Sequence, residues 1–446
     1  MRVCVIGTGY VGLVTGTCLA YMGHDVVCVD NNEGKVNLLK AGQSPIYEPG
    51  LPEIITECLQ KEKIRFTTDL ASSIAYGDII FIAVGTPSLP DGQSDMRYVE
   101  AVARGIGENL TGGYKVIVNK STVPIGSGDW VRMIVLDGMN SKGNEAEFDV
   151  VSNPEFLREG VAVYDTFNPD RIVLGSDSQR ALDLMQELYR NLIERQYAED
   201  KTLPPVPVVT TDLNSAEMIK YAANAFLAVK ISFINEVANI CDRVGGNVME
   251  VSRGIGLDSR IGSKFLQAGI GWGGSCFGKD VSALIHTAAD YGYETQILKA
   301  CVRVNQVQRT VVIEKLQQVL KVLKGKTIGL LGMTFKPDTD DMRDAPSITV
   351  IEQLNRLGAR VKAYDPIVSQ SGMRDGFSNV IVETDPERLA DGCDALILVT
   401  DWQEFRNLDY GRIASLMHNP VMIDARNFLD KHALEGIGFK YVGLGR

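Results

Sequence analysis

The sequence predicts an α/β protein in which two Rossmann-like, doubly wound domains are joined by a long central helix. A glycine-rich turn between a strand and a helix opens the chain, at Gly7 to Gly12. A second, weaker copy of the same order of elements follows Gly325, and an apolar helical stretch from about Asp212 to Val244 lies between the copies. Strands that alternate with helices in this way are typical of parallel sheets covered by helices on both faces.

The first unit of this pattern has the features of a dinucleotide-binding turn. An apolar strand at 2–6 leads into Gly7-Thr8-Gly9-Tyr10-Val11-Gly12, a helical segment reaches Met22, and a strand at 25–29 ends at Asp30. In such a unit the pyrophosphate binds the amides at the helix N-terminus, and the acidic residue binds the ribose hydroxyls. Asp30 would repel a 2'-phosphate, so the predicted cofactor is NAD, held by Gly7, Gly9, Tyr10, Val11, Gly12 and Asp30.

Three further strands end in polar loops. The strand at 78–84 leads into Gly85-Thr86-Pro87, the strand at 115–119 into Ser121-Thr122-Val123-Pro124, and the strand at 150–152 into a loop with Glu155, Arg158 and Glu159. Open α/β sheets bind ligands at the carboxyl ends of their strands. Thr86 and Thr122 could equally cap turns or helices, and the charged loop is either a solvated face or the rim of a substrate site.

The central helix is predicted from its length and apolar content. Pro204, Pro205 and Pro207 mark a boundary before it, and at 1.5 Å per residue the stretch from Asp212 to Val244 would be about 50 Å long. A helix of that length would connect domains or form a subunit interface. Lys220 and Asn224 share one of its faces, and in an apolar stretch they need partners unless the lysine reaches solvent.

The chemistry is predicted at the loop that runs from Gly271 to Asp280. It carries Cys276 among four glycines, with Lys279 and Asp280 directly after it. Such a setting lets the backbone approach a ligand and lets a thiol act as a nucleophile; the alternative is a glycine loop with an incidental buried cysteine. The other seven cysteines lie in apolar contexts, and neither cysteines nor histidines show metal or disulfide spacing, so no metal site is expected.

The last part of the chain echoes the first. A helical segment is expected from the cysteine loop to about Gln308, and after Gly325 come a strand at 327–331, Gly332, a helix at 347–357 and a strand at 360–364 that ends at Asp365. This copy lacks the G-x-G-x-x-G pattern, which predicts that it binds a different nucleotide. The predicted domains are 1–203, which binds NAD, 204–310, which is helical, and 311–446, which binds the second nucleotide.

Composition excludes several classes of function. The net charge is -11, which argues against a general nucleic-acid or acidic-membrane binder. The N-terminus enters a strand directly, without a signal-peptide pattern, and the chain has no apolar run long enough to span a bilayer. We therefore expect a cytoplasmic protein.

Taken together, these motifs resemble the nucleotide-sugar 6-dehydrogenases over nearly the whole chain, in order. The segments 222–228 and 256–262 are most similar to the members that act on UDP-glucose, and the enzymes for GDP-mannose and UDP-N-acetylhexosamines are the alternatives. The family usually has proline where this chain has Gly278, so the residues after Cys276 are expected to be placed more loosely.

The resemblance implies that the C6 alcohol of UDP-glucose is oxidised twice, with two NAD, to the carboxylate of UDP-glucuronate. It implies Cys276 as the nucleophile, Lys220, Asn224 and Asp280 around the reacting oxygen and water, and Thr122 and Glu155 as assisting at the water. Implied cofactor contacts are Asp30, Lys35, Thr86, Thr122, Glu159, Lys279 and Arg343. Implied sugar-nucleotide contacts are Glu155, Phe156, Leu157, Arg158, Glu159, Lys220, Asn224, Arg260, Phe265, Leu266, Gln267, Ala268, Gly269, Gly273 and Lys336.

Assembly is the last expectation. The length and apolar content of the central helix exceed what one domain can cover, which predicts at least a homodimer. The resemblance adds that Arg260 would reach the sugar-nucleotide of the neighbouring subunit.

Overall fold

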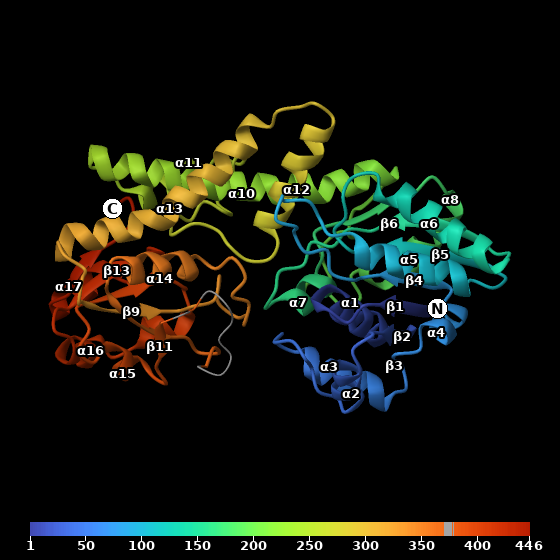
Figure 1. The fold of residues 1–446 in the computed structure, drawn as a ribbon, viewed down its shortest axis with the longest axis horizontal. Helices are drawn as coiled ribbons and strands as arrows, with labels where there is room; N and C mark the ends of the chain where they lie inside the picture. Colours follow the sequence, from blue (N-terminus) through green and yellow to red (C-terminus); the bar gives the residue numbers. More distant parts are fainter. Residues whose placement is uncertain (370–376, 378) are drawn as a thin grey trace. The chain divides into compact units, whose positions relative to one another are not determined.

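The computed structural model describes residues 1–369, 377 and 379–446. These residues form two compact units, the first from 1–223 with 282–291 and the second from 224–281 with 292–446. Each unit is built around a predominantly parallel sheet covered by helices (Figure 1). The helix α10 (Leu213–Val244) begins in the first unit and ends in the second. The predicted fold class, two doubly wound domains joined by a long helix, is confirmed.

The sheet of the first unit has the strand order β3-β2-β1-β4-β5-β6-β7-β8. All neighbours are parallel except β6 and β7. The order reverses between β1 and β4, and open α/β sheets bind ligands at the carboxyl ends of the strands at such a point. The strands are β1 (Arg2–Ile6), β2 (Asp25–Val29), β3 (Ile64–Thr67), β4 (Ile79–Ile82), β5 (Tyr114–Asn119), β6 (Glu147–Ser152), β7 (Ile172–Gly175) and β8 (Val208–Thr211).

Helices cover both faces of this sheet. Successive side chains of a strand point to opposite faces, so each strand contributes to two buried clusters. Val3 and Val5 pack in one buried cluster, whereas Cys4 and Ile6 pack in another. The helices are α1 (Tyr10–Tyr21), α2 (Glu33–Lys40), α3 (Leu51–Gln60), α4 (Leu70–Tyr76), α5 (Arg97–Asn109), α6 (Ser127–Lys142), α7 (Ala162–Phe167), α8 (Gln179–Leu188) and α9 (Arg190–Ile193).

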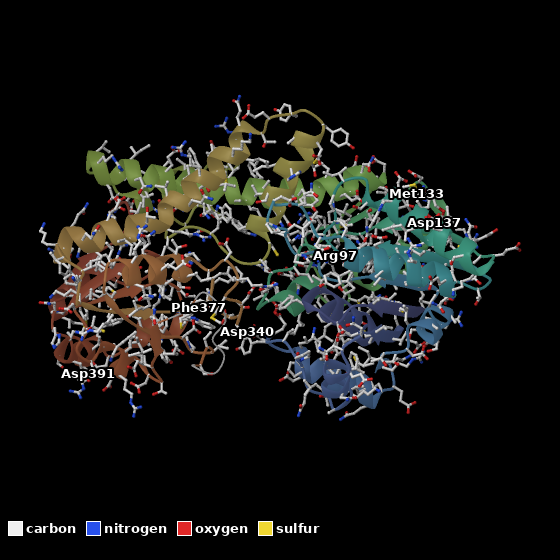
Figure 2. All side chains as sticks on the ribbon, in the orientation of Figure 1. Arg97, Met133, Asp137, Asp340, Phe377 and Asp391 are labelled. Atoms are coloured by element: carbon white, nitrogen blue, oxygen red, sulfur yellow. The ribbon has the colours of Figure 1, made fainter. Side chains whose placement is uncertain are left out.

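Helix α6 shows how the sequence selects the covering face. Val131, Ile134 and Val135 are buried against the sheet. Met133 and Asp137, four residues apart on the opposite side of the helix, are exposed (Figure 2). This three-to-four-residue spacing of apolar side chains is what an amphipathic helix on a sheet requires.

The second unit has the sheet order β11-β10-β9-β12-β13-β14 among its described residues, with all neighbours parallel. One face carries α13 and α14 over Ile328 and Leu330, and the other carries α15, α16 and α17 over Leu331. The elements are α11 (Val248–Gly256), α12 (Phe277–Asp290, which continues into the first unit), α13 (Gln296–Leu320), β9 (Thr327–Leu331), α14 (Pro346–Arg356), β10 (Arg360–Tyr364), β11 (Val380–Val382), α15 (Pro386–Ala390), β12 (Ala395–Leu398), η2 (Gln403–Asn407), α16 (Tyr410–Leu416), β13 (Val421–Asp424), α17 (Lys431–Ile437) and β14 (Lys440–Val442).

The repeat of the first strand–turn–helix–strand pattern after Gly325 is also present in the backbone. Gly7 and Gly332 both have positive φ, +104° and +92°. Each donates its N–H at 2.8 Å to the last carbonyl of the following strand, Gly7 to Val29 and Gly332 to Tyr364. The aspartates after these strands differ, since Asp30 is half-buried whereas Asp365 is buried and accepts from the backbone N–H of Met333 at 2.8 Å.

One predicted boundary is wrong. The helical segment after the cysteine loop is two helices, α12 and α13, and α13 ends at Leu320 instead of near Gln308. The extension is stabilised by Val312, Ile313 and Leu316, which continue the helical spacing and are buried. None of the helices in the described residues is long and apolar enough to cross a membrane.

Candidate functional site

The glycine turn after β1 forms a cradle at the N-terminus of α1. Gly9 stands at the N-cap without a side-chain cap, and a Cβ on it would meet nothing within 4 Å. At Gly12, in contrast, a Cβ would lie 2.0 Å from the carbonyl oxygen of Gly7. The open position leaves the first helical amides accessible to a pyrophosphate, and the crowded one brings helix and strand close together. The residues present therefore fit a dinucleotide.

Asp30 ends β2 beside this cradle. Its carboxylate accepts from Thr8 N at 2.9 Å, Thr8 Oγ1 at 2.6 Å and Asn32 N at 3.0 Å. Partial burial opposes its ionisation, but these hydrogen bonds and the charge of Lys35 outweigh burial and lower the pKa of Asp30. The group is therefore anionic at neutral pH, as recognition of a ribose diol without a 2'-phosphate requires.

Tyr10 links the cradle to the loop that carries Glu159. Its hydroxyl hydrogen-bonds Glu48 and accepts from Gly160 N at 2.7 Å. Glu48, which the sequence did not single out, is 3% exposed and accepts from Gly160 N and Val163 N at 2.7 and 3.2 Å. Two segments far apart in the sequence are thus held at one side of the cradle.

Thr86 and Thr122 follow the neighbouring strands β4 and β5. The Thr86 hydroxyl donates to the carbonyl oxygen of Thr122 at 2.7 Å. Neither residue caps a helix, because the N-caps of α5 and α6 are Met96 and Gly126. The two threonines lie in neighbouring loops that follow β4 and β5, where Thr122 is partly exposed.

Lys220 has a partner in Glu155, so the alternative in which it reaches solvent is wrong. The Lys220 ammonium lies 2.8 Å from Glu155 Oε1, and the two residues are 4% and 7% exposed. Burial opposes ionisation of Glu155, but the Lys220 charge and the hydrogen bonds from Lys220 and Leu157 N lower its pKa. A buried, ion-paired lysine can supply positive charge to a developing oxyanion.

The rest of the loop after β6 is more exposed. Arg158 pairs with Asp165 at the surface, and Arg171 lies 3.6 Å from the centre of the Phe156 ring. Leu157 and Glu159 are half-buried. The loop therefore combines a buried carboxylate, Glu155, with partly exposed side chains, and its role as the rim of a substrate site stays a prediction.

Cys276 is the partly exposed member of the cysteine set, since the other seven are buried. It directly precedes α12, and its carbonyl oxygen accepts from Asp280 N at 2.8 Å. The partial positive charge at a helix N-terminus stabilises a thiolate there. In contrast, burial raises the pKa of the Cys4 and Cys18 thiols to about 12. The structure therefore does not bury Cys276 as the alternative interpretation expected, and its role as a nucleophile stays a prediction.

Asp280 lies one turn into α12 and is fully buried. Its oxygens accept from Lys279 Nζ at 2.6 Å and from Asn224 Nδ2 at 2.6 Å. The second unit thus groups Asn224, Asp280, Lys279 and Cys276, whereas the first groups Lys220, Glu155 and the threonines. The chain connects the groups through α10, on which Lys220 and Asn224 are one turn apart.

The glycines of the cysteine loop are required by protein contacts. A Cβ on Gly273 would lie 2.2 Å from the carbonyl oxygen of Asp344, and one on Gly274 would lie 2.7 Å from the Phe335 ring. These contacts give Gly273 and Gly274 a packing role that the sequence did not indicate, and close approach to a ligand stays a prediction. At Gly278 a Cβ would lie 3.3 Å from the Asp344 carboxylate, which is tight but open enough for a side chain to fit with a small shift.

The other predicted sugar-nucleotide residues of the second unit differ in what they can offer. Phe265 has a φ of +64°, and its ring centre lies 6.4 Å from that of Phe277. Leu266 and Ala268 are 2% exposed, and Gly269 N donates to Asn235 at 2.8 Å. Gln267 is exposed. The segment 265–269 therefore presents two side chains and otherwise backbone.

Three basic residues remain. Lys336 lies 5.6 Å from the centre of the adjacent Phe335 ring. Arg343 pairs with Asp341, and Arg260 pairs with Asp258 while its side chain stays 86% exposed. Arg343 thus has a buried partner, whereas the Arg260 pair lies at the surface, where such a pair contributes little to stability.

Comparison with known proteins gives the same assignment to every part of the chain. Residues 1–193, 214–307 and 329–431 match the NAD binding domain, the central domain and the UDP binding domain of the UDP-glucose/GDP-mannose dehydrogenase family. The chain belongs to this family. The finding confirms the resemblance inferred from the motifs, and it confirms NAD as the cofactor.

Relatives within the UDP-glucose/GDP-mannose dehydrogenase family match the chain from end to end. It is 48% identical over 445 residues to the UDP-glucose 6-dehydrogenase TuaD of Bacillus subtilis, covering 100% of this chain and 93% of the relative. It is 47% identical over 450 residues to the UDP-glucose 6-dehydrogenase of Rhizobium meliloti, covering 100% of both. A UDP-glucose dehydrogenase structure from Pyrobaculum islandicum matches with a TM-score of 0.90 at 37% identity, covering 100% of this chain and 97% of that one.

Two functional candidates of this family member were missed by sequence reasoning. Lys120 directly follows β5 and is 9% exposed; its ammonium donates to Asn153 Oδ1 at 3.0 Å, and burial lowers its pKa to about 8. Arg426 donates to the carbonyl oxygens of Gly271 and Phe335 at 3.3 and 3.1 Å, which ties the cysteine loop to the loop after β9. A lysine directly after an apolar strand was a visible signal, whereas Arg426 had none.

Proposed function

We propose that this chain catalyses the NAD-dependent oxidation of UDP-glucose at C6 to UDP-glucuronate. The observation that carries the proposal is Cys276 at the start of α12, with Asp280 one turn later bonded to Asn224 and Lys279. A dehydrogenase that stops at the aldehyde has no need of a thiol at this place. The relatives named UDP-glucose 6-dehydrogenase support the choice of sugar nucleotide.

The first oxidation removes a proton from the C6 hydroxyl and a hydride from C6. Lys220 stabilises the negative charge that develops on the oxygen, Asn224 adds a hydrogen-bond donor, and Asp280 with bound water takes up the proton. NAD, when bound, accepts one hydride in each of the two oxidations and is exchanged between them. The chain would hold it through Gly7, Gly9, Tyr10, Val11, Gly12, Asp30, Lys35, Thr86, Thr122, Glu159, Lys279 and Arg343.

The second oxidation proceeds on Cys276. The thiolate adds to the aldehyde carbon to give a thiohemiacetal, and loss of hydride from that carbon leaves a thioester. Thr122 and Glu155 assist at the water that then cleaves the C–S bond, which releases the carboxylate and regenerates the thiol. In total, one alcohol, one water and two NAD⁺ give one carboxylate, two NADH and three protons.

The family resemblance assigns sugar-nucleotide contacts to residues of each unit. In the first unit these are Glu155, Phe156, Leu157, Arg158, Glu159 and Lys220, and in the second Asn224, Arg260, Phe265, Leu266, Gln267, Ala268, Gly269, Gly273 and Lys336. The UDP binding domain matched at residues 329–431 supports a uridine nucleotide. GDP-mannose and the UDP-N-acetylhexosamines remain the second candidates, because solved structures at 26% identity include a UDP-N-acetylmannosamine dehydrogenase.

The decisive experiment counts NADH. Purified protein is given a limiting amount of UDP-glucose, GDP-mannose or UDP-N-acetylglucosamine with excess NAD, and absorbance at 340 nm is followed to completion. We expect two NADH per UDP-glucose and much slower turnover of the others. One NADH per sugar would contradict the four-electron reaction, and faster turnover of another donor would contradict the substrate.

We also propose domain limits and an assembly. Domains at 1–203, 204–310 and 311–446 are supported by the three matched ranges. A homodimer or higher oligomer is supported by exposed apolar side chains on α10, where Phe226, Phe233, Ile240 and Val244 are 65%, 52%, 53% and 73% exposed. Their spacing of seven, seven and four residues puts them on one face of the helix.

A further inference from the structure

Glu217 connects three elements of the first unit, α10, α6 and β6, close to Lys220. It lies three residues before Lys220 on α10 and is 4% exposed. Its carboxylate accepts from Gly126 N at 2.7 Å, Gly128 N at 2.8 Å and Ser152 Oγ at 3.0 Å. Gly126, the N-cap of α6, has no cap of its own. Glu217 therefore supplies the cap and fixes the start of α10 to α6 and to the end of β6.

Asn119 lies beside Ser152 on the same face of the sheet. The two residues are register partners at the carboxyl ends of β5 and β6, and register partners of parallel strands direct their side chains to one face. Asn119 is 2% exposed, yet its Nδ2 and Oδ1 have no hydrogen-bond partner among the described residues. A buried amide left without partners costs several kcal/mol, so a native structure rarely retains one.

A small pocket lies where these residues meet. It has a volume of about 10 Å³, and the residues lining it include Asn119, Ser152, Thr122, Glu217 and Lys220. That is the volume needed to admit one water molecule. A water has two hydrogens and two lone pairs, so it can serve both kinds of atom that Asn119 leaves without a partner. It can also donate to Glu217 Oε2, which accepts from Gly126 N.

We propose that this pocket is an internal water site, held by Asn119 and Glu217, that positions Lys220. The water joins the end of β5 to α10, as Glu217 joins α10 to β6 and α6. It is a structural ligand that the reaction does not consume. The link to Lys220 rests on the proposed function, because Lys220 acts there on the developing oxyanion, whereas the existence of the site does not rest on it.

A crystal structure of the unliganded protein tests the site directly. We expect one water within about 3 Å of the Asn119 amide and of Glu217. An empty pocket, an Asn119 amide bonded to protein atoms, or a peak with five or more oxygen ligands at about 2.4 Å, as expected of a metal ion, would each overturn it. This outcome is independent of activity, so it remains informative if the proposed reaction is wrong.

Variants then test the positioning role. Asn119→Leu keeps the side-chain size but removes both amide atoms, and we expect loss of the water and a roughly tenfold fall in kcat. The KM for UDP-glucose should stay within about twofold, because Lys220 contributes mainly in the transition state. Asn119→Ser, which retains a polar group and adds space, should keep the water and at least half of kcat.

Thr17→Val is the matched control. Thr17 in α1 is also fully buried, with a hydroxyl oxygen that has no partner among the described residues, but it does not line the pocket. We expect its kcat to equal that of the wild type. A full kcat in Asn119→Leu together with loss of the water would refute the positioning role, and an equal loss in Thr17→Val would attribute the effect to general destabilisation.

Discussion

Lys220 Nζ lies 2.8 Å from Glu155 Oε1, and neither side chain is more than a tenth exposed. This buried pair brings a residue of α10 to the loop after β6, 65 positions earlier in the chain. The two positions come from separate sequence motifs, and their contact decides that Lys220 faces the protein interior instead of solvent.

Replacing Lys220 should therefore affect both chemistry and stability. Lys220→Ala removes the charge that stabilises the developing oxyanion, and we expect kcat to fall by about 10²- to 10³-fold. It also leaves Glu155 buried without its cation, at a cost of about 3 kcal/mol in the free energy of unfolding. Steady-state NADH production and urea unfolding measure the two effects.

The control for Lys220 is Lys63→Ala. Lys63 pairs with Asp25 at the same 2.8 Å, but both side chains are more than a third exposed. A pair of this kind contributes at most about 1 kcal/mol, and kcat should not change. Similar losses in the two variants would show that burial of the Lys220 pair has no special role.

Cys276 should be the thiol that reacts with electrophiles and the one that turnover requires. Cys276→Ser should abolish steady turnover to UDP-glucuronate, and Cys276→Ala should retain UDP-glucose binding. Mass spectrometry after brief iodoacetamide treatment should find the label on Cys276 and not on Cys58, which is 2% exposed and whose pKa burial raises to about 11. Near-normal turnover in either variant would exclude Cys276 as the nucleophile.

Asp30 should set the preference for NAD over NADP. Its pKa is lowered, so it is anionic at neutral pH and repels a 2'-phosphate. The wild type should show kcat/KM at least about 10²-fold higher with NAD. Asp30→Ser should narrow that ratio, chiefly by weakening NAD binding. Equal efficiency of the wild-type protein with both cofactors would contradict the assignment.

The buried ammonium of Lys120 should make the stability of the first unit depend on pH. Its folded pKa of about 8 lies below the usual 10.5, because burial disfavours the ammonium. Between these values the unfolded chain binds more protons than the folded one, so stability rises with pH; below pH 8 the full cost of about 3 kcal/mol applies. Lys120→Met should remove this cost and so raise the free energy of unfolding. The gain should be smaller by about 1 kcal/mol, because the hydrogen bond to Asn153 is lost.

Hydrogen exchange of the β5 amides at pH 7 and pH 9.5 measures the Lys120 effect. The variant should be the more protected of the two proteins at pH 7, and the difference should shrink at pH 9.5. Lys63→Met is the control, because the Lys63 side chain is partly exposed and the substitution removes no buried charge. A difference between Lys120→Met and wild type that does not depend on pH would refute the lowered pKa.

The apolar face on α10 should be the subunit contact. Phe233→Glu places a charge at the middle of the exposed row, and we expect light scattering to show a shift from oligomer to monomer. Val322→Glu, at a residue 65% exposed beyond the end of α13, should leave the mass unchanged. A wild-type protein that is monomeric and fully active would refute the assembly.

The sequence by itself determined the fold class, the cofactor and the family. Gly7, Gly12 and Asp30 stand at fixed offsets in one strand–turn–helix–strand unit, and Cys276 stands in a short loop with its own neighbours. Such local patterns carry their meaning because backbone geometry and helix termini act over a few residues. The central helix was predictable for the same reason, since its apolar spacing repeats along α10.

The tertiary structure alone decided which side chains are partners. Contacts between distant segments decided that Lys220 does not reach solvent. They also decided which residues order the cysteine loop and how far α13 extends. Burial lowers the pKa of Lys120. Arg426 orders the cysteine loop by donating to the carbonyl oxygens of Gly271 and Phe335, and Glu217 accepts a hydrogen bond from the start of α6. Burial and long-range hydrogen bonds are properties of the packed chain, so no local pattern could assign them.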